Sequence, residues 1–311
     1  PNPDITWETS EQLDFGFDAR MFDSRLGLTF DWYKKTTKDW LVLAPGLGTL
    51  GAPPPYINGG DVENSGIEYS VSWRDKIGDF KYGITLSGAH NDNEVTKIAN
   101  SDGVINGPDN VLSQGTAAIS RVQVGQPIGF FYGFQTNGIM QNQKEVNEYV
   151  TPNGKPYFAD QRPGDLRFVD QNKDGVIDEK DKVYLGNPNP DFELGIQLNF
   201  EYKNVYLNTT LAGKYGMQVM QSYRSFSDNP KQNYTSDIFN RWHGEGTSNT
   251  MPRLPEISNR NNQLISDIYM HDADYLRINN LTIGYNFNSV LNKITWMSNL
   301  KLYMAVNNLY T

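Results

Sequence analysis

The sequence of 311 residues contains no cysteine, which excludes a disulfide framework, a thiolate metal site and a cysteine nucleophile. Histidine is scarce, and the three residues form no His-Glu-x-x-His or other metal-binding spacing. Long apolar runs are also missing, because the longest, Trp40 to Ala44, falls far short of the roughly 18 residues of a membrane helix. A helical membrane protein is therefore excluded.

An excess of positive charge is absent as well. Lys and Arg number 27 against 36 Asp and Glu, for a net charge of −9 spread along the chain. Nucleic acid is not an expected partner, because binding to phosphates by counterion release needs clustered Lys and Arg. No nucleotide-binding or serine-hydrolase motif occurs either. We therefore expect no enzyme activity, although a secreted glycoside hydrolase using two of the many carboxylates stays a second alternative.

Apolar and polar residues alternate in many segments of the chain. This alternation predicts strands that pair as hairpins across short polar turns. The four expected hairpins span 13–21 with 26–32, 67–73 with 80–86, 192–202 with 205–211, and 281–287 with 300–306.

The connections between these hairpins are long and cover 38–60, 93–190 and 216–272. Short and long connections thus alternate, and loops beyond about 15 residues are uncommon in compact soluble domains. The same alternation is expected of an outer-membrane barrel, which has short periplasmic turns and long extracellular loops. The sequence therefore predicts an all-β fold, part of an antiparallel transmembrane β-barrel, whose apolar strand faces meet outer-membrane lipid.

One acidic segment, 170–181, has the spacing of a calcium-binding loop. A hard cation needs six to eight oxygen ligands, and a loop supplies them when alternate side chains point inward and a glycine permits a sharp turn. Gly175 occupies the sixth place of this loop. The expected ligands are Asp170, Asn172, Asp174, the carbonyl of Val176, and Asp181.

The acidic segment departs from an EF-hand in two ways. Asp181 stands where the EF-hand has Glu, and the flanks 166–169 and 183–185 are extended instead of helical. The segment is closer to the calcium loops of dockerin-type modules, which also end with Asp. We expect a structural Ca²⁺, while a simple Asx turn held by its own side chains remains the alternative. A soluble, calcium-binding β-rich binding or surface module is the main alternative for the whole chain.

Several blocks, in order along the chain, resemble the SusC/RagA family of TonB-dependent outer-membrane transporters. They are Asn2-Pro3-Asp4, the block 58–68 (Asn-Gly-Gly-Asp-Val-Glu-Asn-Ser-Gly-Ile-Glu), the block 125–133 (Gly-Gln-Pro-Ile-Gly-Phe-Phe-Tyr-Gly), Pro163-Gly164-Asp165, Gly186-Asn187-Pro188, the block 274–281 (Asp-Tyr-Leu-Arg-Ile-Asn-Asn-Leu) and Asn307-Asn308-Leu309.

The resemblance implies a 22-stranded barrel, plugged by an N-terminal domain, that imports oligosaccharides or peptides with energy from the TonB system. It also implies a SusD-like surface lipoprotein that covers the extracellular mouth. Residues 1–311 correspond to the C-terminal portion of the barrel, with 93–190 as a long extracellular loop. The plug domain and the final strands are expected to lie outside this sequence, and contact with TonB would come from that missing N-terminal part.

Aromatic residues in the long connections are candidates for stacking on sugars or packing against peptides, with ordinary packing inside the loops as the alternative. They are Tyr56, Phe130, Phe131, Tyr132, Tyr223, Phe226 and Trp242.

Overall fold

The computed structural model describes residues 5–43, 56–100, 102–111, 116–221, 234–254, 261–291, 296–297 and 299–311. Within these ranges no helix is both long and apolar enough to cross a membrane. The predicted block Asn2-Pro3-Asp4 and the aromatic residues Tyr223 and Phe226 lie outside the described residues.

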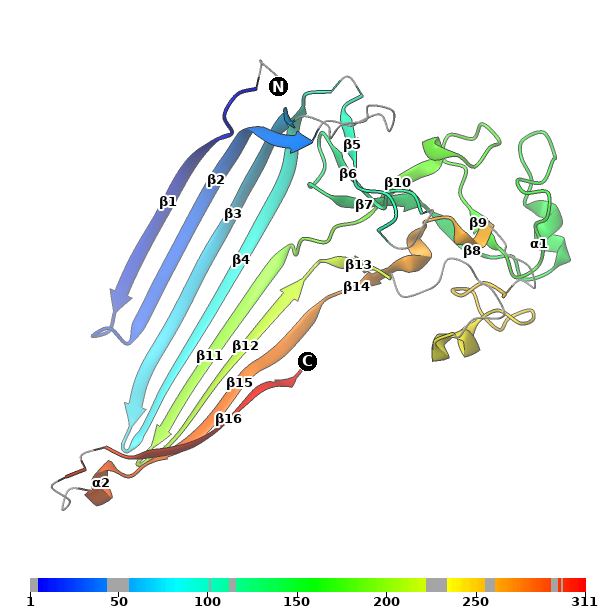
Figure 1. The fold of residues 1–311 in the computed structure, drawn as a ribbon. Helices are drawn as coiled ribbons and strands as arrows, with labels where there is room; N and C mark the ends of the chain where they lie inside the picture. Colours follow the sequence, from blue (N-terminus) through cyan, green and yellow to red (C-terminus); the bar gives the residue numbers. More distant parts are fainter. Residues whose placement is uncertain are drawn as a thin grey trace.

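An antiparallel sheet of eight strands dominates the molecule (Figure 1). Its strands, in spatial order, are β1 (Thr9–Met21), β2 (Leu26–Leu43), β3 (Tyr56–Ile77), β4 (Phe80–Ile98), β11 (Phe192–Tyr202), β12 (Val205–Tyr215), β15 (Tyr275–Asn286) and β16 (Lys301–Tyr310). The four predicted hairpins are all present, as β1–β2, β3–β4, β11–β12 and β15–β16.

The register divides the sheet into two faces, because successive side chains of a strand point to opposite sides. One row of apolar residues crosses five strands: Val71, Leu86, Ile196, Leu211 and Ile278. The next row along the strands is polar: Ser72, Thr85, Gln197, Thr210 and Asn280. We call these the apolar face and the polar face of the sheet.

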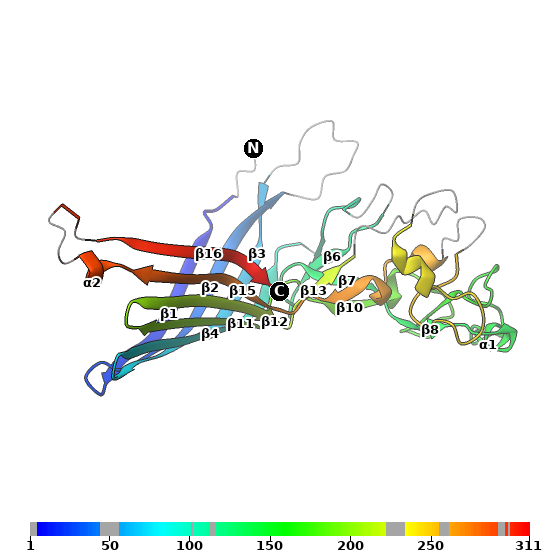
Figure 2. The same ribbon diagram turned by 90° about the horizontal axis from the view of Figure 1, so that it is seen from below.

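The apolar face is uncovered. Phe15 is 71% exposed and Leu302 is 68% exposed, although both side chains are large and apolar. Water would make such a continuous surface an aggregation hazard, whereas lipid would cover it at no cost. Figure 2 shows that the sheet is curved. Two hollows, of about 970 Å³ and 410 Å³, lie on its polar face.

The two ends of the sheet differ. At the turn end the hairpins close through short segments, of which the longest, 287–300, carries the single-turn helix α2 (Asn288–Leu291). At the opposite end, the connection end, the chain leaves the sheet and folds into a separate body (Figure 1). The long connections predicted over 93–190 and 216–272 both leave the sheet at this end, as expected, whereas three of the four hairpins close at the turn end through four residues or fewer.

The folded parts of residues 99–191 and 216–274 form this second body, which we call the loop body. It contains β5 (Val104–Asn106), β6 (Ser120–Gln123), β7 (Phe130–Phe134) and β10 (Lys182–Gly186) in one sheet, and the pairs β8 (Thr136–Ile139) with β9 (Leu166–Phe168) and β13 (Gln218–Met220) with β14 (Met270–Asp272). Its helices are α1 (Gln143–Glu148) and the 3-10 turns η1 (Glu179–Asp181), η2 (Ser236–Asn240), η3 (Asn261–Gln263) and η4 (Asp267–Tyr269).

The strands extend beyond the predicted alternation at several places: β1 begins at Thr9, β4 continues to Ile98 and β15 begins at Tyr275. The connection expected over 38–60 is shorter, because β2 continues to Leu43 and β3 starts at Tyr56. Polar residues occupy both faces here, and cross-strand ion pairs such as Lys34 to Glu63 hold the hairpin together. Amphipathic alternation therefore ends before the strands do.

Candidate functional site at the connection end

Apolar packing joins the two long connections into one loop body. Phe134, Ile139, Leu166 and Phe168, all from the first connection, form a buried cluster that Trp242 of the second connection covers. A second cluster mixes both connections directly and contains Ile119, Met220, Ile265 and Tyr269. A third lies around α1 and contains Met140, Val146 and Tyr149.

A buried ion pair ties the same two connections together. Asp165 is 1% exposed, and its Oδ1 accepts a hydrogen bond from Arg253 Nε at 2.8 Å. Asn262 Nδ2 donates to the same oxygen at 3.0 Å, and the backbone N–H of Arg162 donates to Oδ2 at 2.9 Å. Arg253 Nη2 also donates to Oδ2, at 3.3 Å. These four donors offset the cost of burying the Asp165 charge, as a buried carboxylate requires.

The predicted calcium loop belongs to the loop body, and its turn has the conformation that the spacing suggests. Gly175 has φ +88°, a conformation that favours glycine. Its N–H donates to Asp170 Oδ2 at 2.9 Å, and the hydroxyl of Tyr157 donates to the same oxygen. Burial raises the pKa of Asp170, but these hydrogen bonds outweigh it, so that the pKa of the carboxyl lies below its ordinary value.

The other expected ligands serve hydrogen bonds within the loop. Asn172 Oδ1 accepts from the N–H of Asp174, and Asp174 Oδ1 accepts from the N–H of Val176. Asp181 is fully buried, and its two oxygens accept from the N–H groups of Gln171 and Asp178. Five expected ligands thus lie in one wrapped loop.

The donor set fits a hard cation in part. Among the described residues, no three Asp, Glu or His side chains converge closely enough to hold a metal by themselves. Asp170 Oδ1, however, is buried and has no hydrogen-bond partner, while the other oxygen of the same carboxylate is saturated. A calcium loop has this feature, since one oxygen of its first carboxylate orders the turn and the other faces the ion.

Two hollows lie where the sheet meets the loop body. The first, of about 420 Å³, is on the polar face and is lined by Tyr33, Asn64, Glu68, Asn91 and Asn93 among others. Its side chains are interlinked, because Asn93 Nδ2 donates to Asn64 Oδ1 at 2.9 Å and the Tyr33 hydroxyl donates to Asn91 at 2.8 Å.

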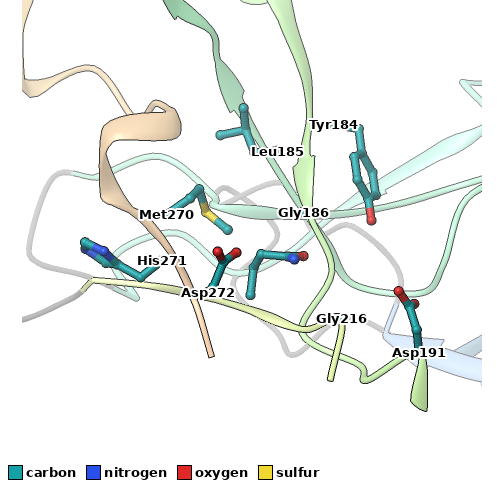
Figure 3. Close-up of a pocket in the computed structure, with 9 residues that line it drawn as sticks. Tyr184, Leu185, Gly186, Asp191, Gly216, Met270, His271 and Asp272 are labelled. Carbon is teal, nitrogen blue, oxygen red and sulfur yellow. The ribbon is translucent and has the colours of Figure 1, made fainter. Parts of the chain in front are cut away.

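The second hollow has a volume of about 600 Å³ and is shown in Figure 3. Tyr184 and Asp191 line one side, and Met270, His271 and Asp272 of β14 line the other. We call it the β10–β14 pocket. Sequence reasoning did not single out these residues, because they come from four segments that only the fold brings together.

Most of the aromatic candidates have packing roles. Phe130 is 2% exposed, Phe131 packs on the Tyr269 cluster, and Trp242 covers the Phe168 cluster. Tyr132 stacks with Arg121, whose guanidinium carbon lies 3.5 Å from the ring centre. Tyr56, at the start of β3, is 57% exposed.

Comparison with known proteins agrees with this architecture. A family model described as TonB dependent receptor-like, beta-barrel, matches residues 1–161. TonB-dependent receptor P3 of Formosa agariphila is 31% identical over all of this chain, which covers 30% of that protein. TonB-dependent receptor SusC of Bacteroides thetaiotaomicron is 26% identical over 99% of this chain and 29% of that protein.

Solved structures share the fold. The RagAB peptide importer in its closed-closed state aligns with a TM-score of 0.75 at 22% identity, over 99% of this chain and 32% of that chain. The chain thus spans about a third of the length of the proteins it matches. The uncovered apolar face, the alternation of turns and long connections, and the matched family model lead to one conclusion. This chain belongs to the TonB dependent receptor-like β-barrel family.

Proposed function

We propose that this chain forms part of the wall and mouth of an outer-membrane importer for a nutrient, driven by the TonB system. The observation that carries the proposal is the division of one continuous sheet into an uncovered apolar face and a polar inner face. Lipid would cover the first, and a passing solute would contact the second. The hollows at the connection end lie where such a solute would enter.

The partners follow from the same proposal. A SusD-like surface lipoprotein would cover the mouth beside the loop body, and the TonB system would act through a part of the protein outside this chain. Similarity to SusC and the shared fold with RagAB support this arrangement. The transported nutrient would be an oligosaccharide or a peptide.

Uptake by cells that carry or lack the gene tests the proposal. The full-length protein should fractionate with the outer membrane and require detergent for extraction. Cells without it should lose uptake of one class of labelled oligosaccharide or peptide, and collapse of the proton-motive force should abolish uptake in cells that carry it. A protein that is recovered in the soluble fraction, or one that hydrolyses a glycan, would refute the proposal.

We further propose that residues 170–181 bind Ca²⁺ as a structural ion. The support is the buried oxygen Asp170 Oδ1, which has no partner, in a loop that already has the wrapped form a cation needs. Ca²⁺ would replace the missing partner and neutralise part of the charge of Asp170, Asp174 and Asp181.

Calorimetric titration of the chelator-treated receptor with Ca²⁺ tests this site. We expect heat of binding for the wild type and a loss of at least about tenfold in affinity for Asp170→Asn, equivalent to about 1.4 kcal/mol. Asp160→Asn, in the same connection but outside the loop, is the matched control. Absence of heat at millimolar Ca²⁺ would refute the assignment.

A further inference from the structure

A carboxylate interrupts the apolar face near the turn end. The β3 side chains that point to this face, in order toward the turn, are Ile67, Tyr69, Val71, Trp73, Asp75 and Ile77. At the level of Asp75 the described strands beyond β3 present apolar or aromatic side chains: Tyr82, Phe200, Leu207, Ile283 and Met304. A charge on a face that meets lipid is costly, so Asp75 needs a partner there.

The partner is Arg25, in the turn between β1 and β2. Its Nη1 donates to Asp75 Oδ2 at 3.1 Å, its Nε donates to the carbonyl oxygen of Phe22 at 3.0 Å, and its guanidinium carbon lies 5.9 Å from the ring centre of Trp73. Asp75 and Trp73 both point to the apolar face, so the guanidinium lies on that side. The hairpin β3–β4 extends beyond the β1–β2 turn, which leaves the ion pair at a step in the rim of the sheet (Figure 1).

The ion pair does not use all of its polar groups. Within the described residues, Arg25 Nη2 has no hydrogen-bond partner, and the Arg25 side chain is 46% exposed. The guanidinium fork matches the geometry of a phosphate group. Asp75 accepts from Arg25 at Oδ2 and from the N–H of Lys76 at Oδ1, so each oxygen keeps a lone pair. The pair therefore offers a donor on one side and an acceptor on the other.

The order of the two charges along the strand fits one class of lipid. The guanidinium contacts Trp73, which lies deeper in the apolar face, whereas Asp75 lies nearer the turn end. In a phospholipid the phosphate is attached to the glycerol, and the headgroup amine lies beyond it. A lipid phosphate would therefore reach Arg25, and a terminal ammonium would reach Asp75.

Two other headgroups fit less well. A headgroup of net negative charge would be repelled by Asp75. A trimethylated amine has no N–H to donate to the carboxylate.

We infer that Arg25 and Asp75 bind a phospholipid whose zwitterionic headgroup ends in a primary ammonium. The phosphate accepts hydrogen bonds from Arg25, and the ammonium donates to Asp75. The acyl chains cover Trp73 and its neighbour Phe22, which is 58% exposed. This lipid site is separate from the import function and requires only that lipid covers the apolar face.

Native mass spectrometry of the purified full-length receptor tests the site. The probes are phosphatidylethanolamine, phosphatidylcholine and phosphatidylglycerol with identical acyl chains, offered in equal amounts. They carry a primary ammonium, a trimethylated amine and a net negative charge, respectively. We expect the wild type to retain phosphatidylethanolamine at least about fivefold more than either of the others, because hydrogen bonds between charged groups are the strong ones.

Two variants remove the site. Arg25→Met combined with Asp75→Leu replaces the ion pair by apolar side chains, a change that proteins often tolerate without loss of stability, and it should abolish the preference among the lipids. Asp75→Asn keeps the size of the side chain but removes its charge, so retention of phosphatidylethanolamine should fall to the level of phosphatidylcholine. Heat-dependent gel mobility checks that each variant assembles.

Arg74→Gln is the matched control, because Arg74 is adjacent to Asp75 in β3 but points to the polar face. This variant should keep the wild-type preference. The inference is overturned if the wild type does not distinguish the three lipids, if assembled Asp75→Asn or the double variant retains them as the wild type does, or if Arg74→Gln loses the preference equally.

Discussion

The buried pair of Asp165 and Arg253 allows a quantitative prediction about the loop body. Arg253→Met removes the guanidinium and leaves the Asp165 carboxylate, which is 1% exposed, with its remaining donors from Asn262 and Arg162. Breaking a buried ion pair from one side costs roughly 3–5 kcal/mol. Because the Arg253 side chain is 19% exposed, we expect the lower end, about 3 kcal/mol.

Hydrogen–deuterium exchange of the full-length receptor measures this loss. The free energy of local opening should fall in peptides that cover β8 and β9, whereas peptides from β11 and β12 serve as the internal control. Asp165→Asn combined with Arg253→Met removes both charges and keeps an acceptor for Asn262. The double variant should therefore be more stable than Arg253→Met alone.

Two results would refute this reasoning. A loss below about 1 kcal/mol for Arg253→Met would show that water solvates Asp165 and that the pair behaves like a surface ion pair. Equal stability of the single and double variants would show that the charge of Asp165 is not the source of the cost.

Two further changes test the sheet and the loop body. Leu198→Arg places a charge on the apolar face and should destabilise the assembled barrel by about 2–4 kcal/mol, whereas Gln197→Arg on the polar face should be tolerated. The folded fraction of each variant is measured by heat-dependent gel mobility. Equal folded fractions would contradict the assigned faces. The hydroxyl of Tyr149 donates to the carbonyl oxygen of buried Phe168 and accepts from the N–H of the same residue. Tyr149→Phe removes both hydrogen bonds and should lower the local stability, measured by hydrogen exchange, by about 1–3 kcal/mol. Tyr132→Phe, with a long 3.4 Å bond to Glu179, should cost less, and similar losses in both would point to a packing effect instead.

The strands could be predicted from the sequence because each has a simple local cause. In β11, Leu194, Ile196 and Leu198 point to one face, and the polar residues between them point to the other, so the pattern predicts the strand and its hairpin with β12. It does not predict that β11 also pairs with β4. The full lengths of β2 and β3 could not be predicted, because the alternation of apolar and polar residues stops where both faces of these strands become polar.

The loop body could not be predicted in the same way. Asp165 is one of 36 acidic residues, and its partner Arg253 lies 88 positions away with no pattern linking them. The predicted calcium-binding segment 170–181 is local, and its turn at Gly175 has the form that the spacing predicts. Yet only the structure distinguishes the fully buried Asp181 from Asp170, whose Oδ1 is unpartnered. The β10–β14 pocket depends on long-range contacts throughout.

The shared packing of the two long connections also bears on how such receptors can diversify. Trp242 and Arg253 of the second connection complete the core of the first, so neither connection carries all the contacts that fold it. A second connection that lacks a cation at the place of Arg253 would leave Asp165 unpaired, while moving both connections of this chain together would keep the pair. Recombination and receptor engineering should therefore succeed when both connections are transferred together, although they are separated along the chain.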